Sequence, residues 1–334
     1  FPIVEVVLAI STGLLVWFIA GNALDAGLLM SFILYLNQLF RPLRVIADKF
    51  NVLQMGMVAA ERMFKVMDNP DQMPPDSIDS VDAGVLHGNI EFKDVWFAYK
   101  EDQYVLKGIN FSIGAGQTVA LVGHTGSGKT SIISLLNRLY TTQKGSLLLD
   151  QKPITSYTLE SLRRNIGVVL QDVFLFSDTI ANNIAFGLDH PEMALIEKAA
   201  KDADVYQNII DFPKGFETML GERGITLSGG QKQRVSIARA IAKEPKIMIL
   251  DDCLSAVDTK TENAILTALK KIMENRTSII ISHRVSSAKL ADQIIVLDEG
   301  RIIEQGNHET LMAKKGVYAE LFEKQTNSGE PIEG

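Results

Sequence analysis

One stretch of the sequence has the residue types and spacing of a loop that binds phosphate. Glycines let backbone N–H groups turn toward an anion, a lysine ammonium can reach the outer phosphates, and a threonine hydroxyl can bind Mg²⁺. The β-branched run 118–122 precedes this stretch and a helical pattern through Leu139 follows it, which is the context that a phosphate-binding loop (P-loop) requires. The stretch reads Gly123, His124, Thr125, Gly126, Ser127, Gly128, Lys129 and Thr130.

Two neighbouring carboxylates follow a second apolar run. Residues 247–250 are Ile-Met-Ile-Leu, and Asp251 and Asp252 come directly after them. Open α/β sheets bind their ligands at the carboxyl ends of strands, so an aspartate there can hold Mg²⁺. A solvated acidic turn is the alternative for such a pair in isolation, but a phosphate-binding loop upstream favours the metal-binding interpretation.

A third segment is predicted to start a helix with uncovered backbone N–H groups. Ser228 can cap the helical pattern 232–242, and the glycines beside it leave their N–H groups bare. One triphosphate already fills the P-loop, so this helix start needs a different phosphate. A head-to-tail dimer, in which each chain closes the other's nucleotide, is the economical arrangement. The segment reads Leu227, Ser228, Gly229, Gly230 and Gln231.

The elements that must position these residues follow from the hydrophobic pattern. From about residue 88, short β-branched runs such as 118–122 and 277–281 alternate with helical patterns, which predicts a mainly parallel α/β sheet. Residues 69–87, rich in Pro, Asp and Ser, are predicted to be a linker. An uninterrupted helical pattern over 48–67 leads into that linker.

The first 46 residues have a different composition from the rest. The run 1–20 carries Glu5 as its only charge, and about twenty residues at roughly 1.5 Å each would cross a hydrocarbon core of about 30 Å. A second, weaker run over 28–46 contains Asn37, Gln38 and Arg41, which should face a bundle interior or a water-filled cavity. Basic residues follow the second run and none precedes the first, which predicts a cytosolic location for the remainder. A buried hairpin of soluble helices is the alternative.

Charge and cysteine content exclude some classes of function. The 334 residues include 33 basic and 40 acidic side chains, a net charge of -7, without a block of like charges, so nucleic acid is not an expected partner. Cys253 is the only cysteine, so no internal disulfide forms, which fits a reducing compartment. The sequence starts at Phe1, already within an apolar segment, and we expect it to be a truncated or processed piece of a protein.

Together, these features resemble the last two transmembrane helices and the nucleotide-binding domain of an ATP-binding-cassette (ABC) exporter, a half-transporter of the multidrug or lipid type. The resemblance implies an α/β P-loop NTPase fold, an ABC-type domain with a helical subdomain, preceded by two transmembrane α-helices. The implied divisions are 1–68 for the membrane helices with their cytosolic extension, 69–87 for the linker, 88–325 for the nucleotide-binding domain with its helical subdomain at 172–227, and 326–334 for a flexible tail.

The resemblance also implies an activity and partners. It implies ATP and Mg²⁺ as cofactors, hydrolysis coupled to movement of a substrate that the sequence does not name, a second ABC half-transporter and membrane lipid as partners, and an inner-membrane location with a cytoplasmic nucleotide-binding domain. Further roles come with it. Tyr99 would stack on adenine, Gln171 would sense Mg²⁺ and contact the membrane domain, and His283 would contact the γ-phosphate. Ser255 and Asp258 would belong to a loop that crosses the dimer interface.

Asp252 departs from the family pattern, because that position usually carries a glutamate that orients or deprotonates the attacking water. A carboxylate set back by roughly 1.5 Å can lose about a hundredfold in rate. Similar substitutions mark the weak site of heterodimeric exporters, so the sequence predicts a heterodimer subunit with a slow site of its own. A homodimeric exporter, a soluble ABC ATPase that acts as a mechanical switch, and a binding module whose ATP holds a dimer together are the alternatives.

Overall fold

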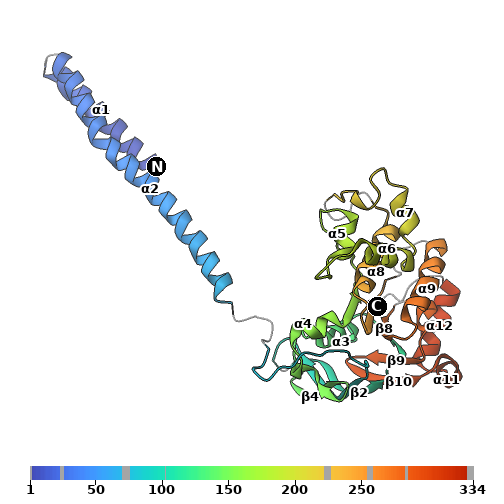
Figure 1. Ribbon diagram of the computed structural model, residues 1–334. Helices are drawn as coiled ribbons and strands as arrows, with labels where there is room; N and C mark the ends of the chain where they lie inside the picture. Colours follow the sequence, from blue (N-terminus) through green and yellow to red (C-terminus); the bar gives the residue numbers. More distant parts are fainter. Residues whose placement is uncertain are drawn as a thin grey trace. The chain divides into compact units, whose positions relative to one another are not determined.

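The computed structural model describes residues 2–22, 26–69, 76–101, 103–221, 227–253, 259–282 and 285–328. The chain divides into two compact units, Phe1–Gln72 and Met73–Gly334 (Figure 1). Within the described ranges, all strands and all predicted site residues lie in the second unit.

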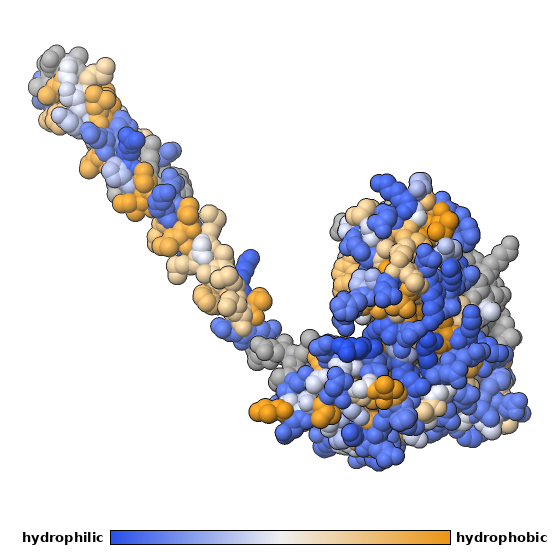
Figure 2. Space-filling model, in the orientation of Figure 1, coloured by the Kyte–Doolittle hydropathy of each residue, from blue (hydrophilic) through white to orange (hydrophobic). Residues whose placement is uncertain are grey.

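The first unit is a hairpin of two helices, α1 (Pro2–Gly21) and α2 (Ala26–Met67), which lie side by side along α1 (Figure 1). Large apolar side chains are exposed on both, as with Trp17 at 75% and Leu34 at 69%, and Figure 2 shows them scattered along the hairpin. Among the described residues, no helix is both long enough and apolar enough to span a bilayer. The prediction of two membrane spans is therefore not confirmed, and α2 carries Asn37, Gln38 and Arg41 inside its apolar run.

The larger sheet of the second unit has six strands in the order β10-β9-β3-β8-β7-β6. All neighbouring strands are parallel except β10, which pairs antiparallel with β9. The prediction of a mainly parallel α/β sheet is confirmed. The strands are β3 (Thr118–Val122), β6 (Ile166–Val169), β7 (Ile247–Asp251), β8 (Thr277–Ile281), β9 (Gln293–Asp298) and β10 (Arg301–Gly306).

A second, antiparallel sheet of four strands lies in the same unit, in the order β2-β1-β4-β5. The sequence pattern does not predict this sheet as a separate layer, because half-buried strands carry a weaker apolar signal than the fully buried β3, β7 and β8. Its strands are β1 (Ile90–Ala98), β2 (Tyr104–Ile113), β4 (Lys144–Leu149) and β5 (Lys152–Pro153).

Helices cover the larger sheet and build the part of the chain between β6 and β7 (Figure 1). α3 (Lys129–Leu136) follows β3, and α8 (Gly229–Ala242) leads into β7. The described residues between β6 and α8 include three short α-helices, as expected for a helical subdomain. The other α-helices are α4 (Leu159–Arg164), α5 (Ile180–Ala185), α6 (Met193–Asp202), α7 (Tyr206–Ile210), α9 (Thr259–Met273), α10 (Val285–Ala288), α11 (His308–Lys314) and α12 (Val317–Ser328).

Strand β7 joins two hydrophobic cores, because successive side chains of a strand point to opposite faces of the sheet. Ile247 and Ile249 pack with α3 and with the apolar residues of β1 and β2. Met248 and Leu250 pack on the other face, with α5, α6, α8 and α9. Burial of each such side chain stabilises the fold by about 1.5–3 kcal/mol. The carboxyl end of β7 is therefore held firmly from both sides.

Candidate functional site

The loop between β3 and α3 contains two positions that only glycine fits. A Cβ atom on Gly123 would lie 2.1 Å from the backbone oxygen of Leu297. A Cβ atom on Gly128 would lie 2.6 Å from Leu106 Cδ2, and Gly128 also has a φ of 104°. These glycines let the chain turn directly from the strand into α3, whose first N–H groups have no partner within the helix.

Lys129, the first residue of α3, is only 5% exposed. Its Nζ donates hydrogen bonds to the backbone oxygens of Gly123, at 2.7 Å, and His124, at 2.8 Å. Burial lowers the pKa of Lys129 to about 8, although Asp251 and Asp252 act in the opposite direction. The ammonium therefore binds the backbone of its own loop. An anion bound at this point would favour the charged form of Lys129.

Asp251 ends β7 and Asp252 follows it, and they are 8% and 4% exposed. Burial, followed by the charge of Asp252, raises the pKa of Asp251 to about 6, while Lys129 lowers it. The N–H of Asp252 donates to Ile281 O at 2.8 Å, which ties this turn to the end of β8. Asp252 itself has a φ of 40°, in the left-handed region that few side chains adopt. Two buried carboxylates lie side by side, with the charge of Lys129 acting on both, and an aspartate at the end of a parallel strand can bind a cation.

Four strand ends of the larger sheet meet at one edge. β3, β8, β7 and β6 are neighbours in that order and all parallel, so the P-loop, Asp251 and Gln171 follow the same edge. Gln171 and Thr130 are both exposed there. A hydroxyl, a carboxylate and an amide oxygen are suitable ligands for Mg²⁺, which also takes phosphate oxygens. In the part of the chain that the structure describes, no group of three or more His, Cys, Asp or Glu could hold a metal alone.

Tyr99 lies just after β1 and is 49% exposed. Its hydroxyl is 3.1 Å from Ser131 Oγ, in the first turn of α3, and the ring of Tyr140 lies edge-on at a centroid distance of 5.1 Å. The ring is therefore fixed against the P-loop helix with part of its surface open, as an aromatic platform for a base requires. Sequence reasoning missed the contacts with Ser131 and Tyr140, and no local signal in the sequence marks them.

The helix start at Ser228 is capped and accessible. Ser228 Oγ accepts a hydrogen bond from the Gln231 N–H at 3.3 Å, and Gln231 Oε1 accepts one from the Ser228 N–H at 2.9 Å. Ser228 and Gly229 are exposed, whereas Leu227 is buried. Gly229 and Gly230 supply the first two N–H groups of the 14-residue helix α8. A phosphate carried by another molecule can therefore approach this point. Three other predicted residues, Ser255, Asp258 and His283, lie outside the described residues.

A P-loop on a parallel sheet, with an aspartate pair and an aromatic platform beside it, defines a nucleotide-binding domain. A family model described as ABC transporter matches residues 106–255, which run from β2 through the P-loop and α8 to just beyond β7. Residues 106–255 therefore match an ATP-binding domain of the ABC transporter family. ATP-binding domains of this family are ATPases.

Known proteins of the same family are similar over nearly the whole chain. The ATP-dependent lipid A-core flippase of Saccharophagus degradans is 42% identical, over 97% of this chain and 55% of the relative. ATP-binding cassette sub-family B member 6 of Xenopus tropicalis is 42% identical, over 94% of this chain and 37% of the relative. A solved structure of a bacterial Atm1-family ABC exporter with ATP bound matches with a TM-score of 0.76 and 39% identity. The match covers 97% of this chain and 57% of the exporter chain. This chain thus spans only about a third to just over half of each of these proteins.

Proposed function

We propose that this chain is the ATP-binding and ATP-hydrolysing part of an ABC exporter, in which ATP binding and hydrolysis drive a substrate across a membrane. The observation that supports this most directly is the edge of the larger sheet, where the P-loop, Asp251 and Gln171 follow neighbouring parallel strands. The similarity to exporters over more than nine-tenths of the chain supports the transport part of the proposal.

In this proposal each site residue has one task. The P-loop binds the phosphates of ATP, and Lys129 moves from its backbone partners to the outer phosphates. Thr130, Gln171 and Asp251 hold Mg²⁺, partly through water, and the ion supplies neutralisation of phosphate charge. Tyr99 stacks on the adenine. Asp252 orients the attacking water, and His283 contacts the γ-phosphate.

We propose that the surface that contacts the membrane part of the transporter lies beside Gln171. Three aromatic side chains that follow Gln171 in the sequence are exposed, Phe174 by 53%, Phe176 by 36% and Phe186 by 63%. The rings of Phe176 and Phe186 stack at a centroid distance of 4.4 Å, and Arg239 lies over both. An exposed cluster of this kind is typical of a contact surface.

The location follows from the same comparison. We infer an inner-membrane exporter with a cytoplasmic nucleotide-binding domain, because the chain is similar to a bacterial exporter. The exposed apolar side chains of α1 and α2 would be covered by further helices and by membrane lipid in the complete protein. Soluble behaviour of the full chain without detergent would favour the alternative of a soluble ABC ATPase.

We infer further that the second nucleotide-binding domain belongs to a different half-transporter. Asp252 stands where a glutamate is usual, so this chain's own P-loop would serve a slow site, while the segment 227–231 completes the partner's site. Co-purification should recover a half-transporter with glutamate at the matching position. A fully active homodimer at ordinary turnover would exclude this proposal.

The nucleotide site is tested by titrating MgATP into the full chain. Charge-assisted hydrogen bonds contribute about 1.5–3 kcal/mol each, so Lys129→Met should weaken the affinity by about tenfold to a hundredfold. Lys152→Met removes an exposed lysine on β5 and is the matched control. The same affinity for Lys129→Met and the wild type would refute the site.

A further inference from the structure

A buried arginine ends the helix that starts at the P-loop. Arg138 follows α3 with a φ of 48°, and its side chain is 2% exposed. The Arg138 N–H donates to Leu135 O at 3.0 Å and the Leu139 N–H donates to Ser134 O at 2.9 Å, which is the left-handed helix end that glycine usually makes. Arginine is disfavoured in this conformation and costly to bury, and its Nη1 and Nη2 atoms have hydrogen-bond partners whereas its buried Nε has none in the described part of the chain.

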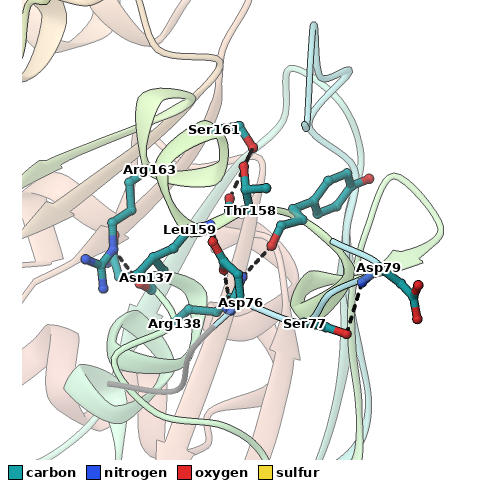
Figure 3. A network of polar contacts seen from close by, with 10 residues as sticks. Asp76, Ser77, Asp79, Asn137, Arg138, Thr158, Leu159, Ser161 and Arg163 are labelled. Atoms are coloured by element: carbon teal, nitrogen blue, oxygen red, sulfur yellow. Dashed lines mark hydrogen bonds and ion pairs between the residues drawn. The ribbon is translucent and has the colours of Figure 1, made fainter. Parts of the chain in front are cut away.

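The guanidinium is held by Asp76, in the segment that precedes the first strand, and by a backbone oxygen just before α4. Arg138 Nη2 donates to Asp76 Oδ1 at 3.0 Å, and Nη1 donates to the backbone oxygen of Tyr157 (Figure 3). The same Asp76 carboxylate accepts the N–H of Leu159, at 3.0 and 3.1 Å from its two oxygens. Figure 3 shows Asp76 between Arg138 and Leu159. One carboxylate therefore joins the end of α3 to the start of α4.

These two helices lead to the two sides of the nucleotide site. α3 carries Lys129 and Thr130 at its other end. α4 leads directly into β6, and Gln171 follows β6. Asp76 thus contacts both elements on the side away from the predicted phosphate and Mg²⁺ ligands.

The rest of the linker is fastened to the same region. Val81 exchanges backbone hydrogen bonds with Ser156 and Thr158, both at 2.9 Å. The N–H of Ala83 donates to Ser161 Oγ at 2.9 Å. Further on, the carboxylate of Asp150 accepts the N–H groups of three consecutive residues where the linker meets β1, His87, Gly88 and Asn89. Asp76 is the most N-terminal of these attachments, so it is where the fastened segment meets the chain that comes from α2.

We propose that Asp76 is a positioning residue that couples the occupancy of the P-loop to the segment 76–89, which contains the C-terminal part of the linker and leads into β1. A phosphate that draws Lys129 into a new position shifts α3, and α3 transmits the shift to Arg138 because a short, well-packed helix moves as a unit. Coupling of this kind is reciprocal, so a change at Asp76 must also change the affinity for the nucleotide. This inference rests on the nucleotide site proposed above.

The test compares Asp76→Asn with the wild type in the full chain. The variant keeps the shape and one acceptor oxygen but removes the charge that pairs with Arg138. Coupling free energies between sites correspond to roughly 5–150-fold changes, so we expect MgATP affinity to fall by at least about fivefold. Hydrogen exchange of the Val81, Thr158 and Leu159 amides should slow when MgATP binds to the wild type, and this slowing should be lost in the variant.

Two further variants decide the interpretation. Asp79→Asn changes an exposed acid of the same linker and should behave as the wild type. When Asp76→Asn is added to Arg138→Met, the affinity for MgATP should not change further. If Arg138→Met does not fold, the comparison of amide exchange with and without MgATP still tests the inference. If Asp76→Asn raises amide exchange equally with and without MgATP and leaves the affinity unchanged, Asp76 is only structural and the inference fails. If the wild type itself does not bind MgATP, the proposed function fails first.

Discussion

Burial sets the charge states of the two ionisable residues at the centre of the candidate nucleotide site. The pKa of Asp251 is raised to about 6 and that of Lys129 is lowered to about 8. Between these values the carboxylate is ionised and the ammonium is charged, which is the combination that MgATP requires. Only between about pH 6 and pH 8 are both residues in the charge states that bind their ligands.

We therefore expect the affinity for MgATP to be highest between about pH 6 and pH 8. Below this range a proton on Asp251 competes with Mg²⁺, and above it Lys129 must take up a proton when the phosphates bind, so the affinity should fall by up to about tenfold per pH unit. Calorimetric titrations over a pH series measure this. Lys129→Arg should remove the alkaline decline, because a guanidinium stays charged. An affinity that is constant from pH 5 to 9 would contradict the prediction.

The identity of residue 252 leads to a prediction for the ATPase rate. Asp252→Glu restores the missing methylene, and we expect the ATPase rate of the assembled transporter to rise by about tenfold or more, because the general base then reaches the attacking water. Asp252→Asn, which keeps the size but not the charge, should not raise the rate. No change with Asp252→Glu would mean that this position has no catalytic role.

At the scale of helices and strands, the sequence predicts best what is fully buried. β3, β7 and β8 are continuous apolar runs, and a P-loop between β3 and α3 has an unmistakable spacing. The end of α3 was predicted less well. The helical pattern continues through Leu139, but the helix ends at Leu136, because Arg138 rather than a glycine makes the left-handed turn.

Long-range side-chain contacts could not be predicted either. The hydrogen bond between Tyr99 and Ser131 and the ion pair between Asp76 and Arg138 join residues that are distant in sequence. Such pairs depend on how β1 and the linker pack on α3, which no local pattern of residues encodes. The two apolar runs at the start of the chain were recognised as helices, but their predicted membrane spans are not confirmed.

The packing of β3 against β9 leads to a prediction for the loop that joins β3 to α3. In Gly123→Ala the new methyl group would meet a backbone oxygen of Leu297 at 2.1 Å, so either β9 or the P-loop must shift. We expect a loss of about 3 kcal/mol in the free energy of unfolding, measured with urea, together with weaker ATP binding. Gly116→Ala is the control, since its φ is 77° but nothing lies within 4 Å of the added Cβ. Equal losses in the two variants would show that backbone strain, not the close approach, dominates.

For the molecule as a whole, two anion-receptive features support the proposal of a second chain. The P-loop already accounts for one triphosphate, and the capped start of α8 is exposed at Ser228 and Gly229. N-terminal ends of helices favour negative charge, and glycines allow a phosphate to approach the backbone closely. The proposed assembly places the partner's nucleotide at this point.

Ser228→Asp tests that assembly without destroying the helix cap. Aspartate caps helices about as well as serine, but its charge would repel a phosphate of the partner's nucleotide. We expect the ATPase rate of the assembled transporter to fall by about a hundredfold, while the affinity of this chain's own P-loop for MgATP stays the same. Asn307→Asp makes the matched change at the exposed cap of α11, which has the same reciprocal hydrogen bonds, and should leave the rate intact. Full activity of Ser228→Asp would show that no phosphate binds at α8, whereas a loss of this chain's own nucleotide binding would place α8 beside its own P-loop rather than a partner's.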